Sequence, residues 1–433
     1  MIAAFAAGAT LLSFNGYGQE PAQPDAQTAQ PGIPGGGAPD AKPEPIKKEK
    51  TWSDYITPDL KGFVYYKLDA TDGKDLANEF GVGRAYVGAK IKPADHFLLR
   101  LTLDAKARVT TAKGKSGTET VEVKDDEGNV IGTAEVPTTE VENTEGAYDV
   151  YLKYAYIEAY DVGVKGLTFR LGQAGFLGIN EVEDYWTYRL QGPILLDAEK
   201  YMSSADLGLS IGYNSPDGLV KLHATVVNGE GYGRSETGKS KDGQLALFFR
   251  PGAKQSGFLH SLVIGAHATY GKYDLDKGAD RRLRAGGLLG MADAKYCLFT
   301  EAYYVQDPTS ERVKEEKKII GVDSPLTQRT DELTSGLLAA VYGWLDFGLF
   351  ASAVDGLRLV GRYDYVDPNL DFSSDQRQRF VAGVGYVFNK YVQILADGQF
   401  TVYGGKAGYD QDKAAYLQPT TEKLALLQME AKY

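Results

Sequence analysis

Arginine and lysine side chains recur at alternate positions in several segments of the sequence. In residues 99–110, Arg100, Lys106 and Arg108 alternate with leucine, alanine and valine, so an extended chain would carry these charges on one face. Such a face acts by electrostatics, because it creates a favourable potential for anions that salt screens over about 10 Å at 0.1 M. The same alternation assigns a larger basic set to one wall: Arg84, Lys90, Arg100, Lys106, Arg108, Arg170, Lys221, Arg250, Arg282, Arg284, Arg358, Arg362 and Arg379.

The acidic residues that fall on the same wall are fewer. They are Asp104, Asp149, Glu301, Asp364 and Asp397, and the face of Glu158 stays open. Two interpretations of the wall stay open: its charges select among ions, or they only pair across strands and keep the interior wet.

A second group of candidate residues lies in a connection, residues 174–204. Its middle is rich in bulky apolar and aromatic side chains, which favour burial. We therefore expect this connection to fold into the space that the strands enclose and to narrow it. The residues that would shape the narrowing are Glu181, Glu183, Asp184, Tyr185, Trp186 and Arg189. The alternative is an outward connection at an interface between subunits.

Enzymatic and metal chemistry find little support in the sequence. Of the four histidines, His96 and His260 fall at predicted turns, whereas His223 and His267 fall on strands separated by one other strand. A zinc site needs further ligands that the sequence does not identify, and no serine and orienting acid accompany either histidine. We therefore expect a protein that is not an enzyme and that binds no cofactor or metal.

The elements that position these residues have a period of two, which is typical of β-strands. The alternation in residues 99–110, 380–388 and 392–402 exceeds the usual five or six residues of a soluble strand and matches a tilted crossing of a bilayer. Beyond the first few residues, no apolar run approaches the roughly 18 residues of a membrane-spanning helix. A transmembrane β-barrel is compatible with this pattern.

Alternating segments number sixteen, and their connections are short and long in strict turn. The segments centre near residues 64, 87, 103, 153, 170, 209, 223, 247, 266, 287, 301, 340, 361, 384, 397 and 428. Short turns at one end and long loops at the other are typical of an up-and-down transmembrane barrel, and a sandwich has no reason to show them. The segments near 153 and 340 leave open which face points inward, and a bulge is expected within 154–158.

The last segment ends on an aromatic residue. Leu427, Met429, Ala431 and Tyr433 alternate with polar residues, and this strand must pair with the first one to remove the open edge. The pattern resembles the C-terminal insertion signal of bacterial outer-membrane proteins. We therefore expect Tyr433 to take part in assembly.

The N-terminal residues predict an address and a spacer. Residues 1–18 contain an apolar run and a small-x-small site, which is typical of a signal peptide. The first basic residue is Lys42, so we expect the true start to lie further upstream. Residues 19–51 are rich in proline, alanine and glycine and predict a periplasmic linker, whereas residues 52–433 predict the barrel.

The charge balance excludes other classes of protein. The formal net charge is −11, and no dense basic stripe supports nucleic-acid binding. Much of the negative charge lies in the connection 111–146, where nine acidic residues accompany three lysines. The single cysteine, Cys297, excludes a disulfide framework.

Several motifs, taken in order, resemble the phosphate-selective porin O/P-type family and its general-porin relatives. The segments that carry the resemblance are Gly83–Lys92, Phe97–Asp104, Phe169–Gln173, Val227–Tyr232 and Gly361–Asn369. The resemblance spans nearly the whole predicted barrel, and each motif alone is weak. The order of the motifs carries it.

The resemblance implies a sixteen-stranded homotrimer in the outer membrane of a Gram-negative bacterium, with the third loop folded into the lumen. Its implied partners are outer-membrane lipid, lipopolysaccharide, the barrel assembly machinery, and small hydrophilic solutes and ions that diffuse passively. The basic residues of the wall predict a modest anion preference. Whether phosphate is preferred stays open, because Glu181, Glu183 and Asp184 stand where a phosphate channel requires lysines. The alternative is a structural or adhesive barrel whose loops bind a partner.

Overall fold

The computed structural model describes only part of the chain. The described residues are 51–72, 75–107, 114–124, 130–141, 148–236, 238–255, 258–275, 280–320, 333–371, 375–404, 408–410, 415–417 and 421–433. The predicted signal peptide, residues 19–50 of the predicted linker, Arg108 and the acidic side chains of the connection 111–146 lie outside them. Predictions on these residues stay predictions.

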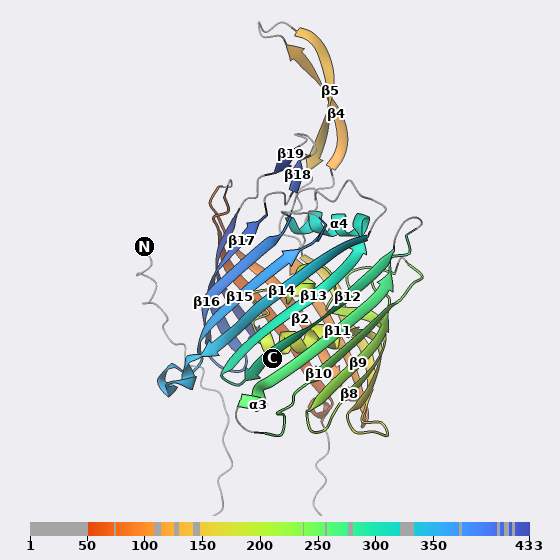
Figure 1. Ribbon diagram of the computed structural model, residues 1–433, viewed down its shortest axis with the longest axis vertical. Helices are drawn as coiled ribbons and strands as arrows, with labels where there is room; N and C mark the ends of the chain where they lie inside the picture. The colour runs from red at the N-terminus through yellow and green to blue at the C-terminus, as the bar shows by residue number, and fades with distance from the viewer. Residues whose placement is uncertain are drawn as a thin grey trace, which may run out of the picture. The chain divides into compact units, whose positions relative to one another are not determined.

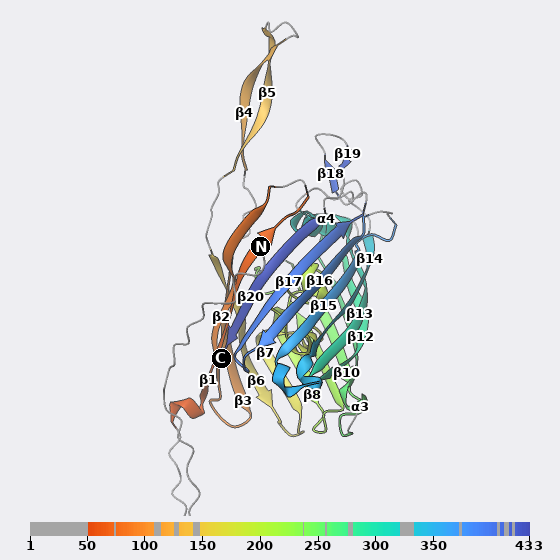
Figure 2. The same cartoon turned by 90° about the vertical axis from the view of Figure 1, so that its left-hand side faces the viewer.

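Sixteen strands of the described chain form one closed antiparallel barrel (Figures 1 and 2). In barrel order they are β1 (Ile56–Asp69), β2 (Ala77–Ile91), β3 (Phe97–Ala107), β6 (Tyr148–Tyr160), β7 (Leu167–Gly175), β8 (Ala205–Asn214), β9 (Val220–Val227), β10 (Asp242–Phe249), β11 (Leu262–Lys272), β12 (Arg281–Asp293), β13 (Tyr296–Pro308), β14 (Leu333–Asp346), β15 (Leu357–Asp367), β16 (Arg377–Val387), β17 (Val392–Tyr403) and β20 (Glu422–Lys432). Each strand contains one of the sixteen predicted centres, so the predicted fold class is confirmed.

The remaining elements lie in the connections. Two antiparallel hairpins are β4 (Gly114–Lys124) with β5 (Val130–Val141), and β18 (Gly408–Asp410) with β19 (Ala415–Leu417). The helices are η1 (Trp52–Asp54), α1 (Leu177–Trp186), α2 (Leu195–Ala198), α3 (Phe258–Ser261), α4 (Thr309–Ile320), η3 (Phe347–Leu349) and η4 (Ser352–Val354). Of the helices in the described ranges, none has the length and apolarity needed to cross a bilayer.

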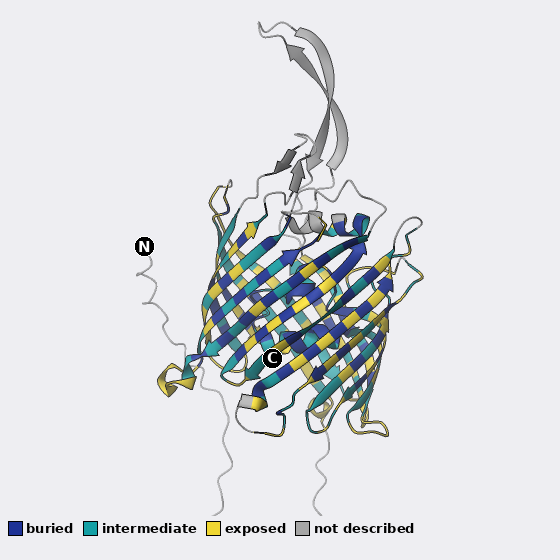
Figure 3. Cartoon of the chain, in the orientation of Figure 1, coloured by how far each residue is buried: buried dark blue, intermediate teal, exposed yellow. Residues whose placement is uncertain are grey.

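Exposed and buried residues alternate along the strands of the barrel wall (Figure 3). On β3, Leu99, Leu101 and Leu103 are exposed on the outside, whereas Thr102 and Asp104 are buried on the inside. The cause is the period of two, which sends successive side chains to opposite faces of a strand. The outer face is therefore apolar, and the inner face carries the polar and charged residues.

A bulge in β6 places two consecutive residues, Lys153 and Tyr154, on the inner side of the wall. Between Thr102 and Leu103 the register of β3 against β6 shifts, and Lys153 of β6 is left without an opposite residue. The expected bulge thus lies one residue before 154–158, and both Lys153 and Tyr154 are buried. Near residue 340 the alternation is regular, because Leu338, Ala340 and Tyr342 are all buried.

The ends of the chain close the barrel. β20 pairs with β17 on one side and with β1 on the other. Beyond β20, Tyr433 donates its backbone N–H to the Leu60 carbonyl at 2.8 Å and accepts from the Leu60 N–H at 3.2 Å. Its ring stacks on Tyr391, with centroids 6.0 Å apart. This closure leaves no unpaired edge at the seam.

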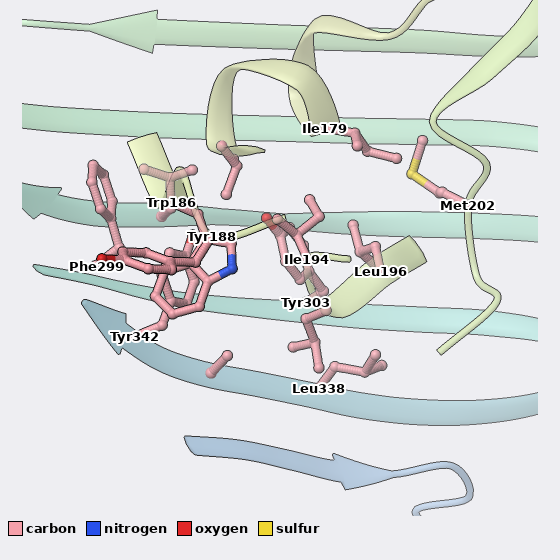
Figure 4. Close-up of a cluster of buried hydrophobic side chains, with 14 of the residues drawn as sticks. Ile179, Trp186, Tyr188, Ile194, Leu196, Met202, Phe299, Tyr303, Leu338 and Tyr342 are labelled. Carbon is pink, nitrogen blue, oxygen red and sulfur yellow. The ribbon is translucent and has the colours of Figure 1, made fainter. Parts of the chain in front are cut away.

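The connection between β7 and β8, residues 176–204, folds against the inner face and contains α1 and α2. Ile179, Val182 and Trp186 are buried on one face of α1, at the spacing of three and four residues that a helix requires. The helix ends where Thr187 adopts a left-handed conformation with φ 57°. Figure 4 shows this face packed among side chains from β13 and β14. We call this connection the inner loop.

Candidate functional site

Aromatic contacts attach the inner loop to one side of the wall. The Trp186 ring lies edge-on to Tyr342 of β14, with centroids 5.3 Å apart, and the Tyr185 ring stacks on Phe299 of β13 at 5.1 Å. These pairs contribute about 0.5–1.5 kcal/mol each beyond the burial of their surface. The apolar middle of the loop is therefore buried inside the barrel, against β13 and β14.

Two of the predicted wall arginines hold the backbone of the inner loop. Arg284 Nε donates to the Tyr201 carbonyl at 2.9 Å, and its Nη2 pairs with Asp307 at 2.6 Å. Arg362 Nη1 donates to the Pro193 carbonyl at 2.7 Å. Both lie on the inner face, yet Arg284 is only 1% exposed. The loop covers them, and they serve as its anchors and do not line open space.

A further anchor joins the loop to α4 and β16. Arg312 of α4 donates to the Glu199 carbonyl at 3.1 and 3.2 Å, and its guanidinium lies 3.8 Å from the centre of the Tyr201 ring. Arg377 Nε donates to the Glu199 carboxylate at 3.0 Å. The loop is thus tied to the wall by charge-assisted hydrogen bonds at both its middle and its end.

The predicted acidic residues of the inner loop are largely neutralised. Lys221 Nζ lies 2.6 and 2.7 Å from the two carboxylate oxygens of Glu181, and Tyr185 donates to the same carboxylate at 2.7 Å. Glu183 pairs with Arg189 at 2.8 Å. Of the three carboxylates that argue against phosphate, two therefore have a basic partner.

Asp184 differs from its two neighbours. It forms no ion pair with any residue that the structure describes, and its side chain is exposed. The pKa of Asp184 is raised above its ordinary value. The larger cause is desolvation by the surrounding barrel, and the second is repulsion from the Glu181 carboxylate. Asp184 thus places a titratable charge on the open side of α1.

A row of basic residues follows the opposite wall. Arg100 Nη2 pairs with Asp59 at 2.5 Å, and its guanidinium lies 4.1 Å from the centre of the Tyr154 ring. Arg84 Nε pairs with Asp104 at 3.2 Å. Tyrosine faces and carboxylates therefore hold these guanidinium groups in place.

The ammonium groups on this wall have fewer partners. The Lys106 ammonium lies 4.4 Å from the centre of the Tyr151 ring, and the Lys153 ammonium lies 4.5 Å from the centre of the Tyr86 ring. Within the described part of the chain, neither lysine forms an ion pair. Both charges therefore add to the positive potential of this wall.

The other predicted wall residues lie at several places on the inner side. Arg170 pairs with Glu158, Arg379 Nε donates to Asp364 at 2.9 Å, and Arg358 lies 3.9 Å from the centre of the Trp344 ring. The three are partly buried and on the expected face.

Arg250 and Arg282 differ in where they lie. Arg250 follows the last residue of β10 and donates to the His260 carbonyl at 3.5 Å, so it belongs to a turn. Arg282 pairs with Asp242 at 2.7 Å and is buried. Arg250 thus lies off the basic wall, whereas Arg282 faces inward and lines the same cavity as Arg84 and Lys106.

The two inward histidines pack on the inner loop. His223 stacks on the Phe176 ring at 6.1 Å and accepts the Leu177 N–H at 3.2 Å, and His267 lies edge-on to Phe176 at 5.7 Å. Across the described residues, no cluster of three histidine, cysteine, aspartate or glutamate side chains could hold a metal ion. The role that these contacts indicate for His223 and His267 is packing against the inner loop.

Three inner residues were not predicted from the sequence. Lys153 was missed because the sequence leaves open the face of the segment near residue 153. The available signal was the alternation from Asp149 through Tyr151, which Lys153 continues. The bulge then turns Tyr154 inward as well. Tyr232 lies in the quoted motif Val227–Tyr232, but nothing in a single sequence shows that its loop folds inward. Arg312 lies on a helix that the period of two does not predict.

Comparisons with known proteins agree on the architecture. No protein-family model and no curated protein matches the sequence. The solved anion-selective porin from Comamonas acidovorans has a TM-score of 0.54 and 9% identity, covering 87% of this chain and 100% of that chain. Salmonella typhi OmpF in complex with daunomycin has a TM-score of 0.52 and 13% identity, covering 88% and 99%.

Pseudomonas putida OprB at high pH has a TM-score of 0.52 and 11% identity, covering 88% of this chain and 95% of that chain. At such low identity the likeness concerns the fold. The chain therefore has the sixteen-stranded barrel fold of outer-membrane porins. Membership of the phosphate-selective O/P-type family stays a prediction.

Proposed function

We propose that this protein is a porin of the Gram-negative outer membrane, a water-filled channel through which small hydrophilic solutes and ions diffuse passively. The observation that carries the proposal is the closed wall with an apolar outside and a charged inside. A barrel of about this strand number is wide enough to leave an aqueous channel. The role is transport without catalysis.

The outer face supports a place in lipid. Leucine and valine side chains on the outside of β3, β14 and β15 are exposed, and every strand of the barrel has neighbours on both sides. Hydrocarbon offers no hydrogen bonds to an open edge, so only a closed barrel is stable there. Outer-membrane lipid and lipopolysaccharide are the surroundings that we infer, with the barrel assembly machinery inserting the chain through the strand that ends at Tyr433.

A modest preference for anions follows from the two sides of the lumen. On one side, Lys106 and Lys153 carry charge without a carboxylate partner among the described residues. On the other, Lys221 neutralises Glu181, and Arg189 neutralises Glu183. These two lysines and the two neutralised carboxylates support the proposed preference, which Asp184 opposes.

We infer a homotrimer from the sequence resemblance and from the porin fold. Chemical cross-linking in outer-membrane vesicles, followed by electrophoresis without heating, would give a band of three chains. A single-chain band under the same conditions would contradict the trimer but not the channel.

Planar-bilayer recording tests the function directly. Purified protein added to one chamber is expected to produce stepwise, ohmic increases in current, and a potassium chloride gradient is expected to give a reversal potential of the anion-selective sign. A structural or adhesive barrel with a blocked interior predicts insertion without conductance, and that result would overturn the proposal.

A further inference from the structure

The loop between β9 and β10 is bent back into the barrel by three tethers. The Asp206 carboxylate of β8 accepts the N–H groups of Gly229 at 2.9 Å and of Gly231 at 3.2 Å. Arg282 of β12 donates to the Gly229 carbonyl at 2.6 Å. Tyr232 donates its N–H to the Ala205 carbonyl at 3.1 Å.

The two glycines allow this bend. Gly229 and Gly231 have φ of 97° and 79°, a region that side chains disfavour. A Cβ on Gly229 would lie 2.6 Å from Arg282 Nη1, and a Cβ on Gly231 would lie 2.7 Å from the Cβ of Ser203. The sequence Gly-Glu-Gly before Tyr232 therefore encodes a close approach to the wall and to the inner loop.

The side chain of Tyr232 then reaches a distant strand. Its hydroxyl donates to Asp104 of β3 at 2.7 Å, and Asp104 also pairs with Arg84. Along the wall, β6, β7 and β8 separate β3 from β9, the strand that leads into the loop. The bond joins parts of the barrel that are not adjacent along the wall. The Tyr232 side chain therefore spans a chord of the lumen.

Tyr232 shares a cavity with the end of the inner loop. The cavity has a volume of about 350 Å³, and Lys106, Tyr151, Lys200 and Ser203 line it together with Tyr232. The Tyr151 and Tyr232 rings meet edge to face, 6.4 Å apart. A solute that passes between this wall and the inner loop therefore meets the Tyr232 ring.

We propose that Tyr232 is a size-determining residue of the channel and forms a second narrow point, independent of α1. The inference rests on the proposed porin function. Its hydroxyl bond to Asp104 holds the ring across the lumen, and the ring sets the largest solute that can pass on this side.

The experiment measures single-channel conductance and the entry of a trisaccharide into liposomes. Tyr232→Ala is expected to raise both relative to the wild-type protein, because the chord is removed. Tyr65→Ala is the matched control: Tyr65 of β1 also donates to a carboxylate, that of Glu79 at 3.1 Å, but to the adjacent strand β2. The control is expected to leave both quantities unchanged.

A folded Tyr232→Ala protein with wild-type conductance and wild-type sugar entry would overturn the inference, while leaving a conducting wild-type protein as evidence for the porin function. A wild-type protein that does not conduct would instead refute the porin function.

If Tyr232→Ala does not fold, Tyr232→Cys replaces it. A charged methanethiosulfonate reagent is expected to lower its conductance, and dithiothreitol to restore it. The wild-type protein serves as the control, since Cys297 is buried. Insensitivity of the folded variant to the reagent would also overturn the inference.

Discussion

Lys221 of β9 lies 2.6 Å from Glu181 of α1, and this ion pair joins the barrel wall to the inner loop. The pair holds a basic residue predicted to line the wall and an acidic residue predicted to shape the narrowing. Because each neutralises the other, neither contributes its full charge to the ion path. Removal of one partner should expose the other.

Lys221→Gln is expected to move the reversal potential toward cations, because the Glu181 carboxylate then stands uncompensated beside Asp184. Glu181→Gln is expected to move it toward anions. Lys254→Gln is the control, since Lys254 pairs with Asp217 in an exposed turn. Equal potentials for Lys221→Gln and the wild-type protein would place the pair away from the ion path.

The pH dependence of selectivity should report on Asp184. Its pKa is raised, so it takes up a proton at a higher pH than an ordinary aspartate as the solution is acidified. The lost negative charge should increase the anion preference in that pH range. Reversal potentials recorded over pH 7 to about 4 would show this shift, and Asp184→Asn should flatten it. A shift of the same size in Asp184→Asn would assign the titration to another group.

The basic wall should act most strongly at low salt. Arg100→Glu is expected to shift the reversal potential toward cations at about 0.1 M potassium chloride, and less at 1 M, because the Debye length falls from about 10 to 3 Å. Lys254→Glu, in an exposed turn, serves as the control. An identical effect of the two variants would argue against a special role of the wall.

The inner loop should stabilise the barrel as well as narrow it. Trp186 is 1% exposed, and Trp186→Ala is expected to lower the free energy of unfolding by about 3–5 kcal/mol. Trp52→Ala, at a residue that is 73% exposed, should change it little. Urea titration followed by the electrophoretic mobility of unheated samples measures both.

Deletion of residues 178–191 is expected to raise the conductance and admit larger sugars, because α1 leaves the lumen. The anchoring arginines would lose part of their partners, so a lower thermal stability is also expected. Unchanged conductance of the folded deletion variant would show that α1 lies outside the path of ions.

Assembly should depend on the last residue. Tyr433→Asp is expected to reduce insertion, because the charge replaces the ring that stacks on Tyr391. Tyr433→Phe keeps the ring and should insert like the wild-type protein. Heat-modifiable protein in outer-membrane fractions measures insertion, and wild-type amounts for Tyr433→Asp would contradict the insertion signal.

The sequence alone determined the strands and, for most of them, the face on which each residue lies. Leu99 and Arg100 face opposite sides because neighbouring side chains alternate and because lipid and water favour different groups. The same reasoning located the closing strand before Tyr433 and the aromatic loop around Trp186.

Only the tertiary structure decided which inner residues meet. Arg284 and Arg362 alternate correctly, yet the inner loop covers them, because the backbone carbonyls of the loop need donors inside the barrel. Lys153 continues the inward alternation of Tyr151, and the bulge then turns Tyr154 inward beside it, which a regular alternation does not predict. Tyr232 reaches Asp104 across 128 residues of sequence, and no local pattern encodes a contact between side chains that the closing of the barrel brings together.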